Sequence, residues 1–253
     1  MMHWDIVAGS ATGAHHAGQR LPCQDALSYG RSGQWVIAVV CDGAGSARYG
    51  DFGAGHAAES IVRELSLIPD MAPRGIRDAE NFWHKAIITA IGSTRLQLKK
   101  KMTEGSDNLS DYHATVVGAV AGPDYGLFFH IGDGAGFAMT RRCWEAVAVS
   151  RPENGEYADQ TFFYTMDNWR DHLRLTFFNA AEVITLMSDG AMAFVADKHL
   201  NGPDPKFIAP VIRYLDSVDE RTGNTALAHT LDSAQTHAIT GDDKTLLIIM
   251  KRF

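Results

Sequence analysis

The chain contains few cysteines. Cys23, Cys41 and Cys143 are the only three in 253 residues, and they are widely spaced and odd in number. This count argues against a disulfide framework, and the spacing gives no zinc-binding pattern. We therefore expect a protein of a reducing compartment and interpret all three cysteines as small core residues.

Long apolar runs and an excess of positive charge are also missing. No stretch of 18 apolar residues is present, and residues 1–5 lack the charged and apolar regions of a signal peptide. We therefore expect a cytoplasmic protein without a membrane partner. The formal net charge of −7 argues against nucleic acid as the main partner. The one basic run, Lys99-Lys100-Lys101, is expected at a solvated helix end.

No low-complexity linker divides the chain, and its hydrophobic content of 45% is ample for a core. We expect a single domain that spans residues 1–253.

One stretch of the sequence indicates a candidate site. Residues 36–41 form an unbroken apolar run that ends in Asp42 and Gly43. Such a run is typical of a strand buried on both faces, which would bring Asp42 to the edge of the core. An Asp-Gly pair often marks a hairpin, but residues 43–55 are small, polar and glycine-rich and contain no second strand.

Three further aspartates repeat this pattern. Asp133 and Asp189 each follow another apolar run, whereas Asp242 precedes one. Each taken alone fits a turn, and Asp133-Gly134 in particular fits a hairpin between two strands. Antiparallel pairing, however, would bring all of these strand ends together. Carboxylates gathered at one edge raise one another's pKa unless cations neutralise them, and oxygen ligands select Mg²⁺ or Mn²⁺.

The hydrophobic pattern predicts the remaining elements. Helical spacing predicts helices over residues 52–67, 79–98, 205–218 and 224–237, the last with Asn224 as a possible N-cap. Strand-like runs cover residues 4–9, 36–41, 114–121, 127–131, 135–140, 144–149, 183–187 and 245–250. Residues 10–18 and 103–111 are expected as loops. For the irregular residues 150–178, periodicity leaves open a mobile flap over a site or a surface excursion.

Residues 20–25 form a second point of interest. Pro22 disfavours a central strand or a helix interior here, so Asp25 is expected where a loop enters the next strand. An arginine near a cation site is useful only if an anion lies between them, and the planar guanidinium of Arg20 matches phosphate oxygens.

A set of short motifs, taken in order, carries a family resemblance. They are Gly18, Arg20, Gln24-Asp25-Ala26, Val39-Val40-Cys41-Asp42-Gly43-Ala44-Gly45-Ser46-Ala47, His113-Ala114-Thr115, Ile131-Gly132-Asp133-Gly134, Met187-Ser188-Asp189-Gly190 and Gly241-Asp242-Asp243-Lys244-Thr245. Across the whole chain they resemble the metal-dependent protein phosphatases of the 2C family, in particular its bacterial branch. The resemblance implies a mixed α/β fold: a four-layer α-β-β-α sandwich whose two mostly antiparallel central sheets are flanked by helix pairs.

The resemblance also implies roles for individual residues. Asp42 matches the carboxylate that bridges two metal ions, and Gly43 matches a ligand through its backbone carbonyl. Asp189 and Asp242 match the other carboxylates on one ion, and these two with Asp42 are the expected catalytic residues.

Three further positions match more peripheral roles. Asp25 matches the acidic residue that holds the second metal ion, directly or through water. Asp133 matches a position that some bacterial members use for a third, more weakly held ion. Arg20 matches the phosphate-binding arginine.

Two positions depart from the family pattern. Gln24 stands where many members carry glutamate, which would weaken the second metal site. Ala44 stands where eukaryotic members often carry a histidine that can protonate the leaving group. The proton must then come from metal-bound water, from His15 or His16, or from solvent.

The sequence thus predicts a protein serine/threonine phosphatase that uses two Mn²⁺ or Mg²⁺ ions, with room for a third, to activate water. Its expected partners are phosphoprotein substrates and a cognate serine/threonine kinase. Two alternatives remain: a phosphohydrolase of small metabolites, and a non-catalytic module that binds a phosphorylated partner. Retention of Asp42, Asp189 and Asp242 favours an enzyme.

Overall fold

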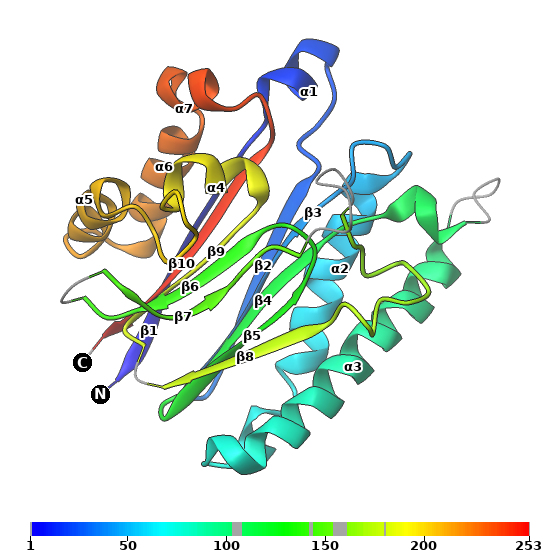
Figure 1. The fold of residues 1–253 in the computed structure, drawn as a ribbon, viewed down its shortest axis with the longest axis vertical. Helices are drawn as coiled ribbons and strands as arrows, with labels where there is room; N and C mark the ends of the chain where they lie inside the picture. Colours follow the sequence, from blue (N-terminus) through cyan, green and yellow to red (C-terminus); the bar gives the residue numbers. More distant parts are fainter. Residues whose placement is uncertain (1, 103–107, 142–143, 154–160, 180, 253) are drawn as a thin grey trace.

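The computed structural model describes residues 2–102, 108–141, 144–153, 161–179 and 181–252. Two five-stranded sheets pack face to face, and helices cover the outer face of each (Figure 1). Neighbouring strands within both sheets are antiparallel. The four-layer α-β-β-α sandwich predicted from the sequence is confirmed. Within the described ranges, no helix is both long enough and apolar enough to cross a membrane.

The first sheet carries Asp42. Its strands, in spatial order, are β2 (Asp25–Ser32), β3 (Trp35–Asp42), β4 (Val116–Ala121), β5 (Tyr125–Ile131) and β8 (Arg174–Asn179). Helices α2 (Gly50–Leu65) and α3 (Ile76–Lys101) cover its outer face (Figure 1). Both helices were predicted, with ends that differ by two or three residues. The basic run forms the exposed last turn of α3, as expected.

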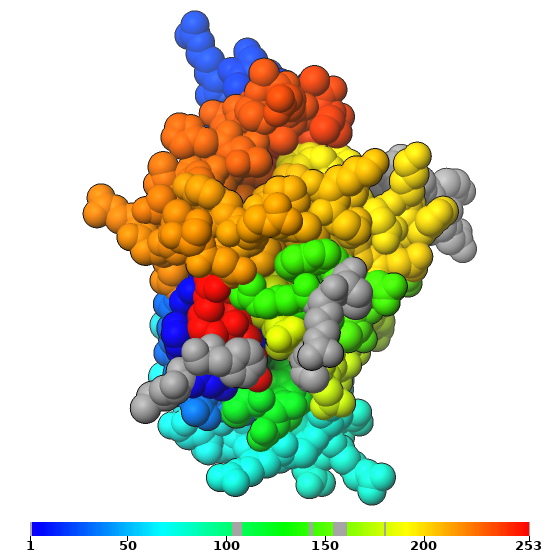
Figure 2. Space-filling model, turned by 90° about the vertical axis from the view of Figure 1, so that its left-hand side faces the viewer, coloured from blue at the N-terminus to red at the C-terminus, as the bar shows by residue number. Residues whose placement is uncertain are grey.

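The second sheet carries Asp242 and Asp189 at its edge. Its strands, in spatial order, are β1 (His3–Ala11), β10 (Lys244–Arg252), β9 (Val183–Met187), β6 (Ala135–Met139) and β7 (Ala146–Ser150). Its outer face is covered by α4 (Asp189–Val195), α5 (Pro205–Leu215) and α6 (Glu220–Leu231). Figure 2 shows these helices in yellow and orange across one side of the molecule, with the blue and red ends of the chain together below them.

Short helices complete the chain. Helices α1 (Ala14–Gln19) and α7 (Ala234–Ile239) lie beyond the strand ends, at the end of the sandwich away from the two termini (Figure 1). Two 3₁₀ turns, η1 (Pro69–Met71) and η2 (Leu109–Tyr112), border α3 in the sequence.

Burial on both faces explains the unbroken apolar run of strand β3. Successive side chains of a strand point to opposite faces. Val36 and Val40 therefore pack between the two sheets, whereas Ile37, Val39 and Cys41 pack against the α2–α3 layer. All five are at most 1% exposed. The predicted burial of this strand on both faces is confirmed, and its last residue, Asp42, is delivered to the end of the sandwich.

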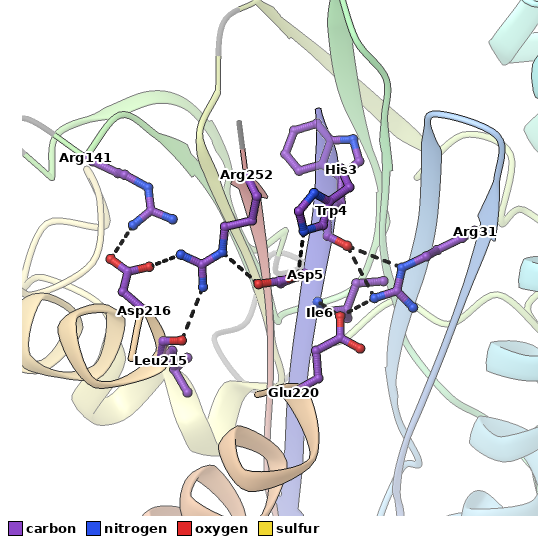
Figure 3. Close-up of polar contacts among 10 residues, drawn as sticks. All are labelled: His3, Trp4, Asp5, Ile6, Arg31, Arg141, Leu215, Asp216, Glu220 and Arg252. Carbon is purple, nitrogen blue, oxygen red and sulfur yellow. Dashed lines mark hydrogen bonds and ion pairs between the residues drawn. The ribbon is translucent and has the colours of Figure 1, made fainter. Parts of the chain in front are cut away.

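Ion pairs close the opposite end of the sandwich (Figure 3). Arg252, in the last strand, pairs with Asp5 in β1 at 2.7 Å and also with Asp216 at the end of α5. Arg31 in β2 pairs with Glu220, the first residue of α6. Glu220 also accepts a hydrogen bond from the backbone N–H of Ile6 at 2.7 Å. These contacts fix the junction of α5 and α6 to strands from both sheets.

The helix predicted over residues 224–237 is wrong, because the structure divides it in two. Helix α6 begins at Glu220 after Asp219, whose carboxylate accepts the N–H of Thr222 at 2.7 Å. Asn224, the expected N-cap, lies inside α6, and its side chain accepts the N–H of Ala8 in β1 at 2.8 Å. Ser233 caps the separate helix α7. Residues that favour N-caps thus occur at 219, 224 and 233, and packing on β1 decides between them.

The loop predicted over residues 10–18 is also wrong. Strand β1 continues to Ala11, where it pairs with Lys244, and α1 follows from Ala14. Helix α1 buries none of its residues. It therefore has no apolar stripe, which is the signal that sequence periodicity detects.

The hairpin expected at Asp133-Gly134 is not formed. Strand β5 pairs with β4 and β8, whereas β6 pairs with β7 and β9 in the other sheet. The Asp-Gly pair therefore crosses from one sheet to the other. Gly132 makes the crossing possible, since its φ of 115° lies in a region that favours glycine.

Several smaller expectations also need correction. In the irregular segment, residues 174–179 form β8, and Tyr164 and Trp169 are buried, so the described part is packed into the fold; residues 154–160 lie outside the described ranges. Helix α4 was missed. Of the expected core cysteines, Cys41 is buried and Cys23 only half-buried, and Cys143 lies outside the described residues. Of the loop 103–111, residues 103–107 lie outside them, and η2 begins at Leu109.

Candidate metal centre

Four predicted metal ligands meet at one end of the sandwich. Asp42 is the last residue of β3, and Asp189 is the first residue of α4. Asp133 lies on the crossing between β5 and β6. Oxygen atoms of these three carboxylates lie within 4.8 Å of one another. Asp242, just before β10, lines the same cleft, which has a volume of about 450 Å³.

The pairing of β9 with β10 explains how Asp189 and Asp242 meet. Met187, near the end of β9, is opposite Leu246, near the start of β10. Because the strands are antiparallel, the residues after β9 and before β10 extend past the same edge of the sheet. This register brings together two carboxylates, Asp189 and Asp242, that are 53 positions apart in the sequence.

Ser188 joins this edge to the first sheet. Its Oγ accepts the N–H of Thr245 at 3.0 Å and donates to Oδ2 of Asp25 at 2.7 Å. Asp25 in turn is directly opposite Asp42 in the β2–β3 ladder. One serine hydroxyl thus holds a carboxylate of the first sheet against the strand ends of the second.

Gly43 is required by close approach of the backbone. A Cβ at this position would lie 2.4 Å from the carbonyl carbon of Gly50. The Gly43 N–H donates to the Gln24 carbonyl at 3.1 Å. The Asp42 N–H donates to Oγ1 of Thr115 at 3.0 Å, and the Thr115 N–H donates back to the Asp42 carbonyl at 2.8 Å. The backbone around the predicted bridging carboxylate is therefore fixed on both sides.

The protein alone leaves these carboxylates poorly stabilised as anions. Burial raises the pKa of Asp25 from 3.8 to about 7. Burial, with the charges of Asp133 and Asp242, raises the pKa of Asp189 to about 6. Burial and the neighbouring carboxylates raise the pKa of Asp42 well above its usual range. Removal from water and the presence of nearby negative charges both raise the pKa of a carboxyl group, and a bound cation would lower it again.

Unpaired oxygen atoms show that the site fits a divalent cation. Asp25, Asp133 and Asp189 each have one buried carboxylate oxygen without a hydrogen-bond partner among the described residues, and so does the side-chain oxygen of Gln24. Buried polar atoms are usually paired, and these four are all oxygens near one cleft. Oxygen-only donors suit hard ions such as Mg²⁺ and Mn²⁺.

Helix α1 carries the other candidates from the sequence. Arg20 is exposed at its C-terminal end with a φ of 59°, and it is not among the residues that line the cleft. His15 is exposed as well. His16 lines the cleft, together with Asp42, Asp189 and Asp242.

Sequence reasoning missed two polar residues at the site. Thr161 donates to Oδ2 of Asp133 at 2.6 Å, and no pattern around residue 161 indicates this contact. Asp243 is 2% exposed and accepts hydrogen bonds from the backbone N–H groups of Gly13 and Gln24, both at 2.6 Å. The pair Asp242-Asp243 could have indicated this role. Side chains of consecutive residues at the start of a strand point to opposite sides, so two adjacent aspartates take different partners.

Cys23 lies beside the site without the properties of a nucleophile. Burial, with the charges of Asp25 and Asp243, raises the pKa of its thiol well above the usual range. Because the thiolate is the reactive form, Cys23 is unsuited to covalent catalysis. We expect Cys23→Ser to change phosphate release by no more than about twofold. A loss of activity with retained fold and metal binding would instead indicate that the thiol takes part.

A cleft lined by carboxylates at one end of an α-β-β-α sandwich is an arrangement that suits a metal-dependent enzyme. The chain belongs to the protein phosphatase 2C family, whose sequence model matches residues 12–232. It is 26% identical over 258 residues to serine/threonine-protein phosphatase 3 of Escherichia coli (strain K12), a match that covers 98% of this chain and 99% of the relative.

Solved structures show the same fold. A crystal structure of a bacterial serine phosphatase matches with a TM-score of 0.65 at 15% identity, over 98% of both chains. The catalytic domain of the serine/threonine protein phosphatase PstP, in complex with two manganese ions, matches with a TM-score of 0.61 at 14% identity over the whole of both chains. The phosphatase Stp1 from Staphylococcus aureus matches with a TM-score of 0.60 at 16% identity, over 99% of this chain and 95% of Stp1.

Proposed function

We propose that residues 1–253 form a single-domain protein serine/threonine phosphatase that depends on Mn²⁺ or Mg²⁺. The observation that carries this proposal is the group of three carboxylates within 4.8 Å of one another, Asp42, Asp133 and Asp189, in a chain of the protein phosphatase 2C family. Two of them, Asp133 and Asp189, have a buried oxygen without a hydrogen-bond partner among the described residues. The proposed partners are phosphoproteins and a cognate serine/threonine kinase in the cytoplasm.

The proposed ligands divide between two ions. Asp42 would bridge them, and Gly43 would offer its backbone carbonyl. Asp189 and Asp242 would complete the protein ligands of one ion, and Asp25 would hold the other, directly or through water. When bound, such ions lower the pKa of water toward neutrality and offset charge on phosphate oxygens.

The remaining residues would orient this set. Asp133, held by Thr161, is the proposed ligand of a third and weaker ion. Ser188 holds the carboxylate of Asp25 and Thr115 fixes the backbone of Asp42, so this part of the site needs little reorganisation when ligands arrive. Water and phosphate would meet in the cleft without a covalent enzyme intermediate.

The substrate class can be tested directly. We expect phosphate release from phosphoserine and phosphothreonine peptides at saturating Mn²⁺, at kcat/KM values well above those for phosphorylated sugars, nucleotides and amino acids. Faster turnover of a small metabolite would support a metabolite phosphohydrolase. Tight binding of a phosphopeptide without turnover would support a non-catalytic module.

Arg20 is proposed to bind substrate phosphate from the C-terminal end of α1, the helix whose His16 lines the cleft. We expect Arg20→Ala to raise KM about tenfold with little change in kcat, as the loss of one charge-assisted hydrogen bond in the ground state would do. The matched control is Arg77→Ala, at an exposed position of α3. An unchanged KM for Arg20→Ala would remove this residue from the substrate site.

A further inference from the structure

His16 is distinguished by its position in the cleft. Of the residues that line the cleft in the described part of the chain, it alone carries a basic nitrogen. The other titratable side chains there are carboxylates, which are the proposed metal ligands. Residues 44–46, after Asp42-Gly43, are Ala-Gly-Ser and offer no stronger acid than a serine hydroxyl. A departing serine or threonine alkoxide therefore has few possible proton donors here.

Asp243 holds the ring of His16. The Nδ1 atom lies 2.8 Å from Oδ2 of Asp243, and the side chains are 17% and 2% exposed respectively. The same carboxylate accepts the N–H of Gly13 on Oδ1 and the N–H of Gln24 on Oδ2. Two backbone N–H groups, one before α1 and one after it, thus fix the orientation of Asp243, and Asp243 fixes the ring of His16.

This arrangement determines the tautomer of the imidazole. Two backbone N–H groups already donate to Asp243, so the carboxylate acts as an acceptor and Nδ1 of His16 carries the hydrogen. In the neutral ring Nε2 is then the basic atom, and in the charged ring Nε2–H can donate. Because Nδ1 is occupied, Nε2 is the atom able to exchange a proton with a molecule in the cleft.

We propose that His16, positioned by Asp243, protonates the leaving oxygen of the phosphoester. This proposal rests on the proposed phosphatase function. As the bond from phosphorus to the serine or threonine oxygen breaks, that oxygen takes the proton of Nε2–H, and phosphorus gains the oxygen of water. The released alcohol carries the proton from His16. The neutral ring regains a proton from solvent, which also receives the proton lost by the attacking water. The net reaction is ester plus water to alcohol plus phosphate.

The leaving group provides the test. A nitrophenolate departs without protonation, whereas a serine alkoxide needs it. We expect His16→Ala to lower kcat for a phosphoserine peptide by roughly 10²-fold, in the usual range for general acid catalysis, and kcat for p-nitrophenyl phosphate by less than about threefold. The ratio of the two rates cancels any loss of folded protein or metal occupancy. His84→Ala, at an exposed position of α3, is the matched control.

Each outcome of this test has a distinct meaning. Equal losses on both substrates would overturn the proposal, because a merely structural or metal-positioning role affects both. A rise in KM alone would also overturn it, by assigning His16 to phosphate binding. Wild-type protein that hydrolyses neither substrate would instead refute the phosphatase function. Free imidazole should restore turnover of the phosphopeptide by His16→Ala, and failure to do so counts against proton donation.

A second set of measurements tests the positioning role of Asp243, first by NMR and then by turnover. Long-range ¹H–¹⁵N NMR of the metal-free wild type should show neutral His16 as the Nδ1–H tautomer, with its signals assigned by their loss in His16→Gln. The Nε2–H tautomer would overturn the proposal. Asp243→Asn, if folded by circular dichroism, should lose the Nδ1–H preference and show the same selective defect on the phosphopeptide. Equal losses by this variant on both substrates would overturn the positioning role.

Discussion

We expect Asp189→Asn and Asp242→Asn each to lower phosphopeptide turnover by about 10³-fold. Each variant should lose a metal contribution to the transition state of about 4 kcal/mol, at a tenfold loss of rate per 1.36 kcal/mol. Both aspartates line the cleft, and Asp189 lies within 4.8 Å of two other carboxylates. Asparagine keeps the shape of each side chain but removes its negative charge. The measurement is kcat over a Mn²⁺ titration, with metal affinity from calorimetry.

The control for these variants is Asp171→Asn, at an exposed position away from the cleft. It should retain full activity. The fold of both site variants should be unchanged by circular dichroism. If either one kept most of its activity at saturating Mn²⁺, the role proposed for that aspartate would be wrong.

The carboxylates of Asp25 and Asp189 should make the metal-free protein less stable as pH rises. The pKa of Asp25 is raised from 3.8 to about 7 and that of Asp189 to about 6, so between about pH 4 and pH 7 the folded site binds more protons than the unfolded chain. Their contribution to the free energy of unfolding therefore falls across this window. For Asp189 alone, the shift corresponds to on the order of 3 kcal/mol at pH 7.5.

Substitution isolates this effect from other titrations. In EDTA at pH 7.5, Asp189→Asn should raise the free energy of unfolding in urea, and the gain should shrink toward pH 5. At saturating Mn²⁺ the wild type should instead be more stable than Asp189→Asn, because the wild type binds metal more tightly and binding stabilises the folded state. A variant that is less stable than the wild type in EDTA would contradict the picture of uncompensated carboxylates. Asp171→Asn again provides the control.

Much of the site could be predicted because its aspartates lie next to apolar runs that are recognisable as strands. Asp189 follows an apolar run and Asp242 precedes one, and the antiparallel pairing of β9 with β10 brings these two ends together. Asp42 ends a strand of the other sheet, and the packing of the two sheets brings it to them. Asp133 was predicted as a ligand, but the hairpin interpretation of Asp133-Gly134 was wrong, because an Asp-Gly pair between two strands has the same local sequence whether the strands share a sheet or belong to two sheets. Only tertiary packing distinguishes these cases.

Other features have no local signal at all. Helix α1 lacks an apolar stripe, so its pattern resembles a loop. The contacts of Asp243 join residues more than 200 positions apart in the sequence, and periodicity does not report such contacts. Asn224 could be recognised as a cap-forming residue, but its side chain bonds to β1 instead. Asp243 and Asn224 were therefore missed or misassigned because their partners are distant in sequence, whereas α1 was missed because its own sequence carries no helical stripe.

Phosphate release from a phosphothreonine peptide, with and without metal, tests the central claim most directly. The wild type should lose turnover in excess EDTA and recover it when Mn²⁺ is restored, whereas folded Asp42→Asn should stay inactive throughout the Mn²⁺ titration. Turnover that persists in EDTA, or that survives the Asp42→Asn substitution, would contradict a phosphatase whose metal ions are held by this carboxylate cluster.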